Sequence, residues 1–251
     1  MTRVVAFANQ KGGVAKTTST LSVAAALAEM GRRVLAIDLD PQGALSYSTG
    51  IDPDALPETV NDVLVRRLPI EKVVITREVD LVPANIDLAG AEAILLAKTG
   101  REYALQRALR ELGNVYDYVL IDCPPSLGIL TINGLTAARR VLIPLQCEAL
   151  SHRGVGQLLE QLNDVRHFTN PDLEVAGVLP TMYDGRSLHA REVLDDVGRR
   201  YEVPVFEPAV RKSIRFAEAA QAGRSIVSYA PKHPGADAYR AHARRLEESW
   251  T

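Results

Sequence analysis

Residues 4–19, which read VVAFANQKGGVAKTTS, constrain the fold more than any other stretch of the chain. An apolar run that empties into two glycines and is followed by a helical pattern predicts a buried strand, a tight loop and a helix. Such a loop aims consecutive backbone N–H groups at one point, and the N-terminus of the helix adds positive potential there. The stretch therefore predicts a phosphate-binding loop.

Three side chains at the end of this loop suit a triphosphate that carries Mg²⁺. Lys16 is placed to reach the outer phosphates, the Thr17 hydroxyl to bind Mg²⁺, and Thr18 to donate to an inner phosphate oxygen. The loop departs twice from the usual pattern G-x-x-x-x-G-K-[ST], because Gln10 and Ala15 stand where that pattern has glycine. A glycine turn that carries two surface lysines is the alternative interpretation.

A further lysine, Lys11, stands directly before the two glycines, and the resulting pattern K-G-G-x-x-K-T-T resembles the deviant Walker A loop of the ParA/MinD group of ATPases. The resemblance implies that Lys11 and Lys16 are catalytic, with Lys11 reaching the phosphates held by the other subunit of a dimer. It also implies that the nucleotide contacts Lys11, Gly12, Gly13, Val14, Ala15, Lys16, Thr17 and Thr18. If Ala15 has a positive φ, we expect weaker ATP binding and slow turnover.

Carboxylates follow two buried strands. Residues 33–38 read RVLAID and open a D-x-D-P-Q-G motif at Asp38 and Asp40, and residues 117–126 read DYVLIDCPPS, with Asp122 after the apolar run. Carboxylates beside phosphates would repel the nucleotide unless Mg²⁺ or an attacking water lay between them. The resemblance implies that Asp40 positions that water and that Thr17, Asp122 and Asp40 lie at the metal. An Asp-Pro turn and a strand that ends in aspartate are the structural alternatives.

The base is expected to be adenine. Residues 181–186, TMYDGR, stand where guanine-binding phosphate-loop proteins carry N-K-x-D, and that tetrapeptide is absent. ATP is therefore the expected nucleotide. The resemblance implies that Met182 and Pro208 hold the adenine and that Glu148 lies near the ribose, although a surface glutamate at a strand end is an equal alternative for Glu148.

Apolar runs and helical patterns alternate along the chain, which predicts an α/β fold: a mostly parallel twisted sheet with helices on both faces, as in phosphate-loop NTPases. We expect one domain over residues 1–251, because 47% of the residues are apolar and no linker is evident. No stretch approaches the roughly 18 to 20 apolar residues of a membrane helix, and we expect no signal peptide before the first strand. Cys123 and Cys147 are too isolated for a zinc site or a disulfide framework.

Positive charge gathers toward the end of the chain. Residues 186–251 carry 12 Lys and Arg against 9 Asp and Glu, whereas the rest carries 17 against 22. This bias permits a local basic patch, and non-specific DNA contact asks only for positive side chains at duplex spacing. ParA proteins bind DNA through arginines in matching segments, so the expected contacts are Arg186 and Arg215, and then Arg211 and Lys212. The alternative is that these basic residues lie on helix faces that contact only solvent.

The resemblance covers nearly the whole chain and implies a chromosome or plasmid partitioning ATPase of the ParA (Soj-like) kind. Two subunits that hold ATP and Mg²⁺ would close face to face and join their basic patches on double-stranded DNA. A ParB-type partner would then stimulate slow ATP hydrolysis and release the DNA. Such a protein is expected in the cytoplasm, on the nucleoid.

Two other classes share the deviant loop. A MinD-like ATPase that cycles on membranes needs a terminal amphipathic helix with bulky apolar residues, and here the last turns read RRLEESWT. A carrier like the nitrogenase iron protein needs two well-placed cysteines per chain for a bridging cluster. Cys123 and Cys147 do not fit that requirement, so both classes are less favoured.

Overall fold

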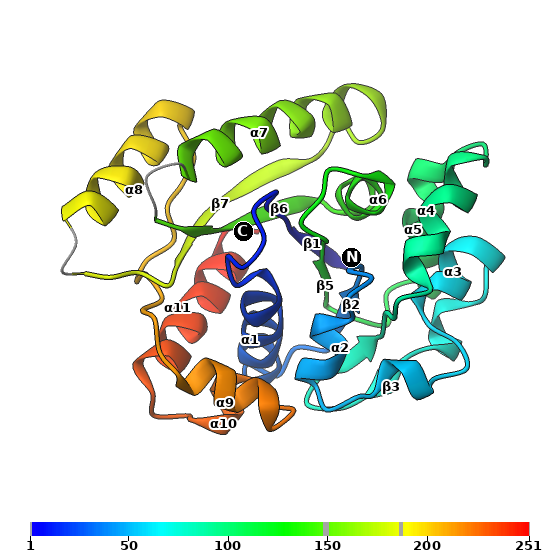
Figure 1. Cartoon of the computed structure of the whole chain (residues 1–251), viewed down its shortest axis with the longest axis horizontal. Helices are drawn as coiled ribbons and strands as arrows, with labels where there is room; N and C mark the ends of the chain where they lie inside the picture. The colour runs from blue at the N-terminus through cyan, green and yellow to red at the C-terminus, as the bar shows by residue number, and fades with distance from the viewer. Residues whose placement is uncertain (1, 148–150, 186–187, 251) are drawn as a thin grey trace.

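The computed structural model describes residues 2–147, 151–185 and 188–250, which form one seven-stranded sheet between two layers of helices (Figure 1). The strand order is β3-β4-β2-β5-β1-β6-β7, and every neighbouring pair is parallel except β3 with β4. The strands are β1 (Arg3–Phe7), β2 (Val34–Asp38), β3 (Ile75–Thr76), β4 (Asp80–Val82), β5 (Tyr118–Asp122), β6 (Arg140–Gln146) and β7 (Glu174–Thr181). The mostly parallel α/β fold that the sequence predicts is confirmed.

The central strands end level with one another. Phe7 of β1 lies opposite Asp122 of β5, and Asp122 lies opposite Asp38 of β2. All five residues of β2 and of β5 are buried, as expected for short apolar runs that are covered on both faces. The register therefore brings the phosphate loop and both carboxylates to the same edge of the sheet.

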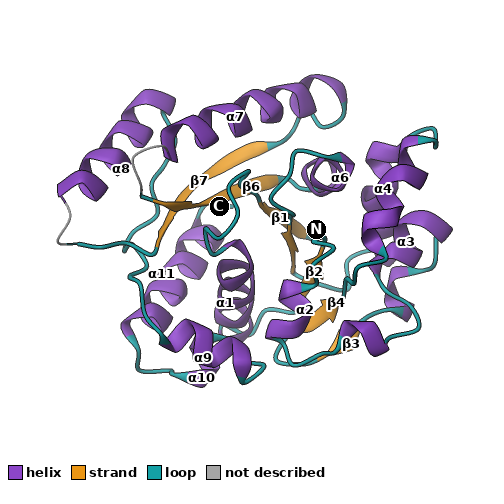
Figure 2. Ribbon diagram, in the orientation of Figure 1, coloured by secondary structure: helices purple, strands orange, loops and turns teal. Residues whose placement is uncertain are grey.

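Helices cover both faces, and Figure 2 shows the strands between them. One buried cluster joins the sheet to α1, α2, α9, α10 and α11, and a second joins it to the other helices. The helices are α1 (Lys16–Glu29), α2 (Ala44–Ser48), α3 (Val60–Arg66), α4 (Leu88–Leu96), α5 (Ala104–Leu112), α6 (Ile129–Ala137), α7 (Ser151–Phe168), α8 (Leu188–Tyr201), α9 (Arg215–Gln221), α10 (Ile226–Tyr229) and α11 (Pro234–Glu248).

The last helix, α11, packs lengthwise on α1. Its apolar stripe, which includes Tyr239, Ala243 and Leu246, is fully buried, and the Tyr239 hydroxyl lies 3.0 Å from the Ser19 hydroxyl on α1. The apolar face of this helix is therefore used inside the protein. Within the described residues, no helix combines the length and apolar character needed to span a bilayer.

Candidate functional site

The phosphate loop is held in place by the two strands beside it. The Asn9 amide donates to the Pro144 carbonyl of β6 (2.7 Å), and its oxygen accepts from the Lys11 N–H (3.0 Å). At the other end of the loop, the Thr181 hydroxyl of β7 donates to the Val14 carbonyl (3.0 Å). The bonds to Pro144 and from Thr181 join residues far apart in the sequence, and all three bonds hold the loop in place.

Ala15 adopts the left-handed backbone conformation, with φ +60° and ψ +35°. It is the N-cap residue of α1 and makes no side-chain capping bond. The conformation costs an L-residue about 1–2 kcal/mol relative to glycine. The positive φ on which the expected penalty depended is therefore present.

Lys16 and Thr17 open α1 beneath this loop. Lys16 is 7% exposed, and its Nζ lies 3.5 Å from the Lys11 carbonyl. Burial lowers the pKa of Lys16, while Asp122 and Asp40 oppose that shift. The Thr17 hydroxyl donates to the Asp122 carboxylate (2.7 Å), so the helix start and the end of β5 are joined at the position where a metal would bind.

Asp38 and Asp122 lie side by side on neighbouring strands, and both are buried. Burial raises the pKa of both carboxyls, and repulsion between the two groups raises it further for Asp122. Asp38 accepts from the Ser46 N–H and hydroxyl, both at 2.9 Å, and from the Asp40 N–H at 3.1 Å. Asp38 thus anchors the segment that carries Asp40, a function that the sequence motif alone does not reveal.

This donor set fits Mg²⁺. A divalent cation would offset the repulsion between buried carboxylates, and Mg²⁺ is usually held by one or two protein oxygens, several waters and phosphate oxygens. Thr17 and Asp122 provide such oxygens at the phosphate loop. Across the described part of the chain there is no cluster of three or more His, Cys, Asp or Glu side chains that would form an all-protein metal site.

Asp40 and Lys11 occupy more open positions than the buried carboxylates. Asp40 is partly buried, and its carboxylate accepts from the Gln42 N–H (2.9 Å). Lys11, Gly12 and Gly13 are exposed at the tip of the loop. The loop therefore presents a lysine on the outer surface of the protein, beside the phosphate position.

A cavity of about 300 Å³ lies beside the loop and α1. Its lining is largely apolar and includes Val210, Phe216 and Tyr239, which suits the flat face of a base. The full lining comprises Ala15, Thr18, Thr181, Met182, Val210, Arg211, Lys212, Ser213, Phe216, Ala217, Ala220 and Tyr239. Met182 thus lines the same cavity as Ala15 of the phosphate loop and Thr18 in the first turn of α1.

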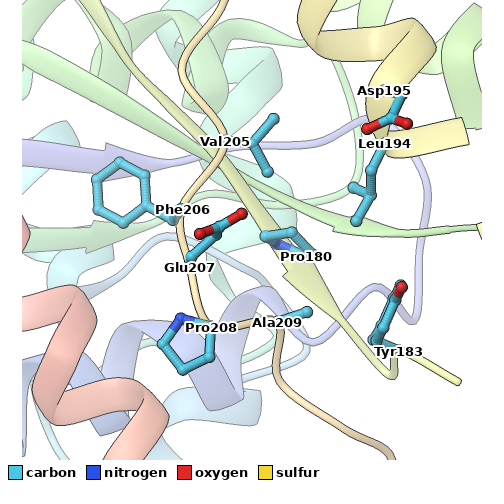
Figure 3. A pocket seen from close by; sticks show the side chains of 9 residues that line it. All are labelled: Pro180, Tyr183, Leu194, Asp195, Val205, Phe206, Glu207, Pro208 and Ala209. Carbon is cyan, nitrogen blue, oxygen red and sulfur yellow. The ribbon is translucent and has the colours of Figure 1, made fainter. Parts of the chain in front are cut away.

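Pro208 lies elsewhere. It lines a second cavity, of about 710 Å³, between the end of β7, α8 and the segment 205–209. In Figure 3 Pro208 and Ala209 lie on one side of this cavity, and Leu194 and Asp195 of α8 lie across it. Met182 and Pro208, which we expected to hold one base together, therefore line different cavities.

The basic residues that we expected at DNA divide between two locations. Arg211 and Lys212 are exposed but line the cavity beside the phosphate loop. Arg215 is the first residue of α9, and its guanidinium pairs with Glu218 at 2.7 Å, which raises the pKa of the arginine. Arg186 and Glu148 lie outside the described residues.

Comparisons with known proteins identify relatives along nearly the whole chain. A family model described as an AAA domain matches residues 2–175. The chain is 42% identical over 247 residues to the chromosome partitioning protein ParA of Myxococcus xanthus, covering 97% of this chain and 87% of that protein. It is 41% identical over 242 residues to the sporulation initiation inhibitor protein Soj of Bacillus subtilis, covering 95% and 96%.

A solved structure is similar along the whole chain. It is a Mycobacterium smegmatis protein described as cobyrinic acid a,c-diamide synthase with bound ADP and magnesium. It shares 54% identity, with a TM-score of 0.90, and the match covers 100% of this chain and 96% of that one. With the phosphate loop, the paired carboxylates and these relatives together, the chain belongs to the ParA/Soj family of chromosome-partitioning P-loop ATPases.

Proposed function

We propose that this protein is a partitioning ATPase that binds ATP and Mg²⁺, closes into a homodimer, binds double-stranded DNA without sequence preference, and releases it on hydrolysis. The observation that carries the proposal is the convergence of Lys16, Thr17 and the Asp122 carboxylate at a loop whose exposed tip holds Lys11. The names of its ParA and Soj relatives support the partitioning function and a ParB-type partner. Residues 1–251 would form a single ATPase domain, located on the nucleoid.

The phosphates would be bound by the backbone N–H groups of residues 12–18 and by the Lys16 ammonium. Thr17 would hold Mg²⁺ through its hydroxyl, and Asp122 would hold the metal's water shell. When bound, Mg²⁺ neutralises charge that develops on the phosphoryl oxygens. Burial of Lys16 strengthens its interaction with phosphate, because little water competes for the ammonium group.

Asp40 is the residue we assign to the attacking water. Its backbone and carboxylate are both held, since the Asp40 N–H donates to Asp38 and the Gln42 N–H donates to the Asp40 carboxylate. One carboxylate oxygen of Asp40 is thereby oriented, while the side chain stays partly open to solvent. A fixed carboxylate of this kind can orient a water for in-line attack on the terminal phosphate.

Lys11 supplies the reason for dimerisation. It is exposed at the loop tip, so its side chain can extend to a nucleotide bound by a facing copy. A positive side chain that contacts the transferring phosphoryl group stabilises the transition state by several kcal/mol in such sites. A monomer that lacks the partner's Lys11 would therefore hydrolyse ATP very slowly.

The base would lie in the cavity of about 300 Å³, against Met182 and the apolar side chains of α9. Pro208 remains a proposed base contact only if the segment 205–209 moves when nucleotide binds. Glu148 remains a proposed ribose contact. DNA phosphates would meet Arg186 and Arg215 first, with Arg211 and Lys212 at the junction of the DNA surface and the nucleotide cavity.

A gel-shift assay with a DNA duplex of arbitrary sequence tests this function. With Mg²⁺ present, ATP should switch DNA binding on, whereas ADP or no nucleotide should leave the duplex unshifted. The affinity should also fall steeply as salt rises. Equal binding in all three nucleotide states, or a flat salt response, would contradict the proposal.

The name of the M. smegmatis structure suggests a second candidate, amide synthesis. Releasing ammonia from an amide donor commonly uses an activated thiolate. Here burial raises the pKa of Cys147 to about 12 and shifts that of the fully buried Cys123 further upward, which disfavours either thiolate. Cobyrinic acid with glutamine or ammonia should leave the ATPase rate unchanged, and a stimulation of turnover would favour the synthase instead.

A MinD-like membrane cycle is the remaining candidate. It would need the apolar face of α11 to be available to lipid, but Tyr239, Ala243 and Leu246 are buried against α1. Co-sedimentation with anionic liposomes in the presence of ATP separates the two proposals. The partitioning ATPase should stay in the supernatant, whereas pelleting that depends on ATP would favour the membrane cycle.

A further inference from the structure

Helix α9 forms one wall of the nucleotide cavity and also carries the proposed DNA arginine. Phe216, Ala217 and Ala220 line the cavity together with Ala15 and Thr18. Arg215 is exposed at the start of the same helix. A ligand that fills the cavity therefore touches α9 directly, one residue away from Arg215.

The other end of α9 contacts the segment that follows Asp38 and Asp40 in the sequence. Gly223, just beyond the helix, and Gly50, just beyond α2, both have positive φ, at +66° and +74°. A Cβ atom on Gly223 would lie 2.8 Å from the Gly50 Cα and 2.9 Å from the Gly50 N. The two backbones are in direct contact, and no residue larger than glycine fits at position 223 unless one of them moves.

Helix α2 connects this contact to the carboxylate site. Asp38 accepts two hydrogen bonds from Ser46 in the middle of α2, and the Gly43 N–H donates to the Asp40 carbonyl (2.9 Å) just before α2 begins. Leu45 of α2 and Ala219 of α9 belong to the same buried cluster. Figure 1 shows α2 and α9 near the end of α1, where the two helices contact each other.

We infer that α9 transmits the nucleotide state to the DNA-binding surface, and that the Gly50–Gly223 contact positions this helix in response to the segment carrying Asp38 and Asp40. This inference rests on the proposed function and concerns its regulation. A ligand shifts a conformational equilibrium only through contacts that differ between the two states. A bound nucleotide has two such routes here: its base contacts the cavity wall on α9, and its triphosphate acts on the carboxylate segment, which reaches α9 through α2.

The test is the coupling ratio, defined as the Kd for duplex DNA without nucleotide divided by the Kd with Mg²⁺ and a non-hydrolysable ATP analogue. In Gly223→Ala the added Cβ forces the two backbones apart, and we expect the ratio to fall about fivefold or more. Analogue binding and dimer formation, followed by titration and sedimentation, should stay near wild type. A purely structural role would lower stability without changing this ratio.

One alanine variant serves as a matched control. Gly31→Ala, just beyond α1, incurs a similar backbone penalty at φ +80° but has no atom within 4 Å of the new Cβ. It should keep the coupling ratio within about twofold of wild type.

A second variant, which alters the route through α2, tests the inference if Gly223→Ala does not fold. Ser46→Ala removes the hydroxyl that donates to Asp38 while leaving the backbone N–H bond in place. It introduces no strain at a positive φ, and it should also lower the coupling ratio while the chain still binds the analogue. The inference is overturned if the folded Gly223→Ala and Ser46→Ala proteins both keep the wild-type ratio.

The outcome for the wild type separates this inference from the proposed function. If wild-type DNA affinity does not respond to the analogue at all, the proposed function fails before α9 is tested. If the wild type responds, and Gly223→Ala and Ser46→Ala both respond as strongly as Gly31→Ala, the partitioning function stands and the relay through α9 is wrong.

Discussion

At the scale of single residues, Ala15 is the clearest departure from a standard phosphate loop. Its φ of +60° is a conformation that glycine adopts without penalty. This strain weakens nucleotide binding only to the extent that it is greater in the filled loop than in the empty one.

Replacing this residue by glycine should relieve that strain. Ala15→Gly should bind ATP with Mg²⁺ about three- to tenfold more tightly, if filling the loop deepens the strain that the empty loop already carries. Titration with a fluorescent ATP analogue measures the change, and Ala89→Gly, on the exposed face of α4, is a control at a distant helical site. An unchanged affinity would show that the strain is the same with and without nucleotide.

His242 is a second residue with a measurable signature. Its ring is fully buried near Phe206 and Tyr239, and burial lowers its pKa to about 4, with Arg245 acting in the same direction. In the unfolded chain the pKa is about 6.5. Between these values only the unfolded state binds the proton, so the contribution of His242 to stability is lost progressively as pH falls from about 6.5 to 4.

The prediction compares wild type with His242→Phe, which cannot take up that proton. The difference in the free energy of unfolding should be constant above about pH 7 and should move against the wild type by up to about 3 kcal/mol on going to pH 4. Urea denaturation at several pH values measures it. A difference that does not vary with pH would contradict the assigned pKa shift.

At the scale of elements, the strands that form the site could be predicted, because buried parallel strands read as short apolar runs. The runs before Asp38 and Asp122 end where β2 and β5 end. Helix α2, in contrast, has only five residues and therefore no periodicity to detect. The bonds from Asn9 and Thr181 could not be predicted, since their partners lie 135 and 167 residues away.

Which residues share a cavity could not be predicted either, because it depends on the three-dimensional arrangement of the chain. Met182 and Pro208 lie on neighbouring segments that bond to each other, since the Tyr183 N–H donates to the Val210 carbonyl at 2.9 Å. These segments turn different sides to two cavities, and no pattern in the sequence distinguishes the sides. The sequence therefore provides candidate residues for the site, but it does not show which of them share a cavity.

Helix α9 yields a prediction at this scale. The ion pair of Arg215 with Glu218 competes with any phosphate that approaches the arginine, although an exposed pair of this kind contributes little to stability. Glu218→Gln should therefore tighten DNA binding in the ATP state by about two- to fivefold, and Arg215→Glu should weaken it while ATP binding persists. Fluorescence anisotropy with labelled duplex measures both.

A matched control is available elsewhere in the fold. Glu102 pairs with Arg101 at 2.9 Å, outside the proposed DNA surface, so Glu102→Gln removes a similar ion pair. Its DNA affinity should equal that of the wild type. If Glu218→Gln behaves like Glu102→Gln, Arg215 does not contact DNA in the way we propose.

At the scale of the whole molecule, one edge of the sheet brings together the phosphate loop, Asp38 and Asp122, and Lys11 lies at its exposed rim. The account requires a second copy to complete the charge around the phosphates. Asp40→Ala should retain ATP and barely hydrolyse it, which traps whatever assembly ATP produces. The Asp40 variant is therefore the state in which dimer closure is easiest to observe.

Sedimentation velocity of Asp40→Ala with saturating ATP and Mg²⁺ tests the central claim most directly, with Asp40→Ala/Lys11→Ala run alongside as the variant that lacks the reaching lysine. We predict a dimer for the single variant with ATP, a monomer with ADP, and a monomer for the double variant even where ATP is bound. A single variant that stays monomeric with bound ATP would contradict the account.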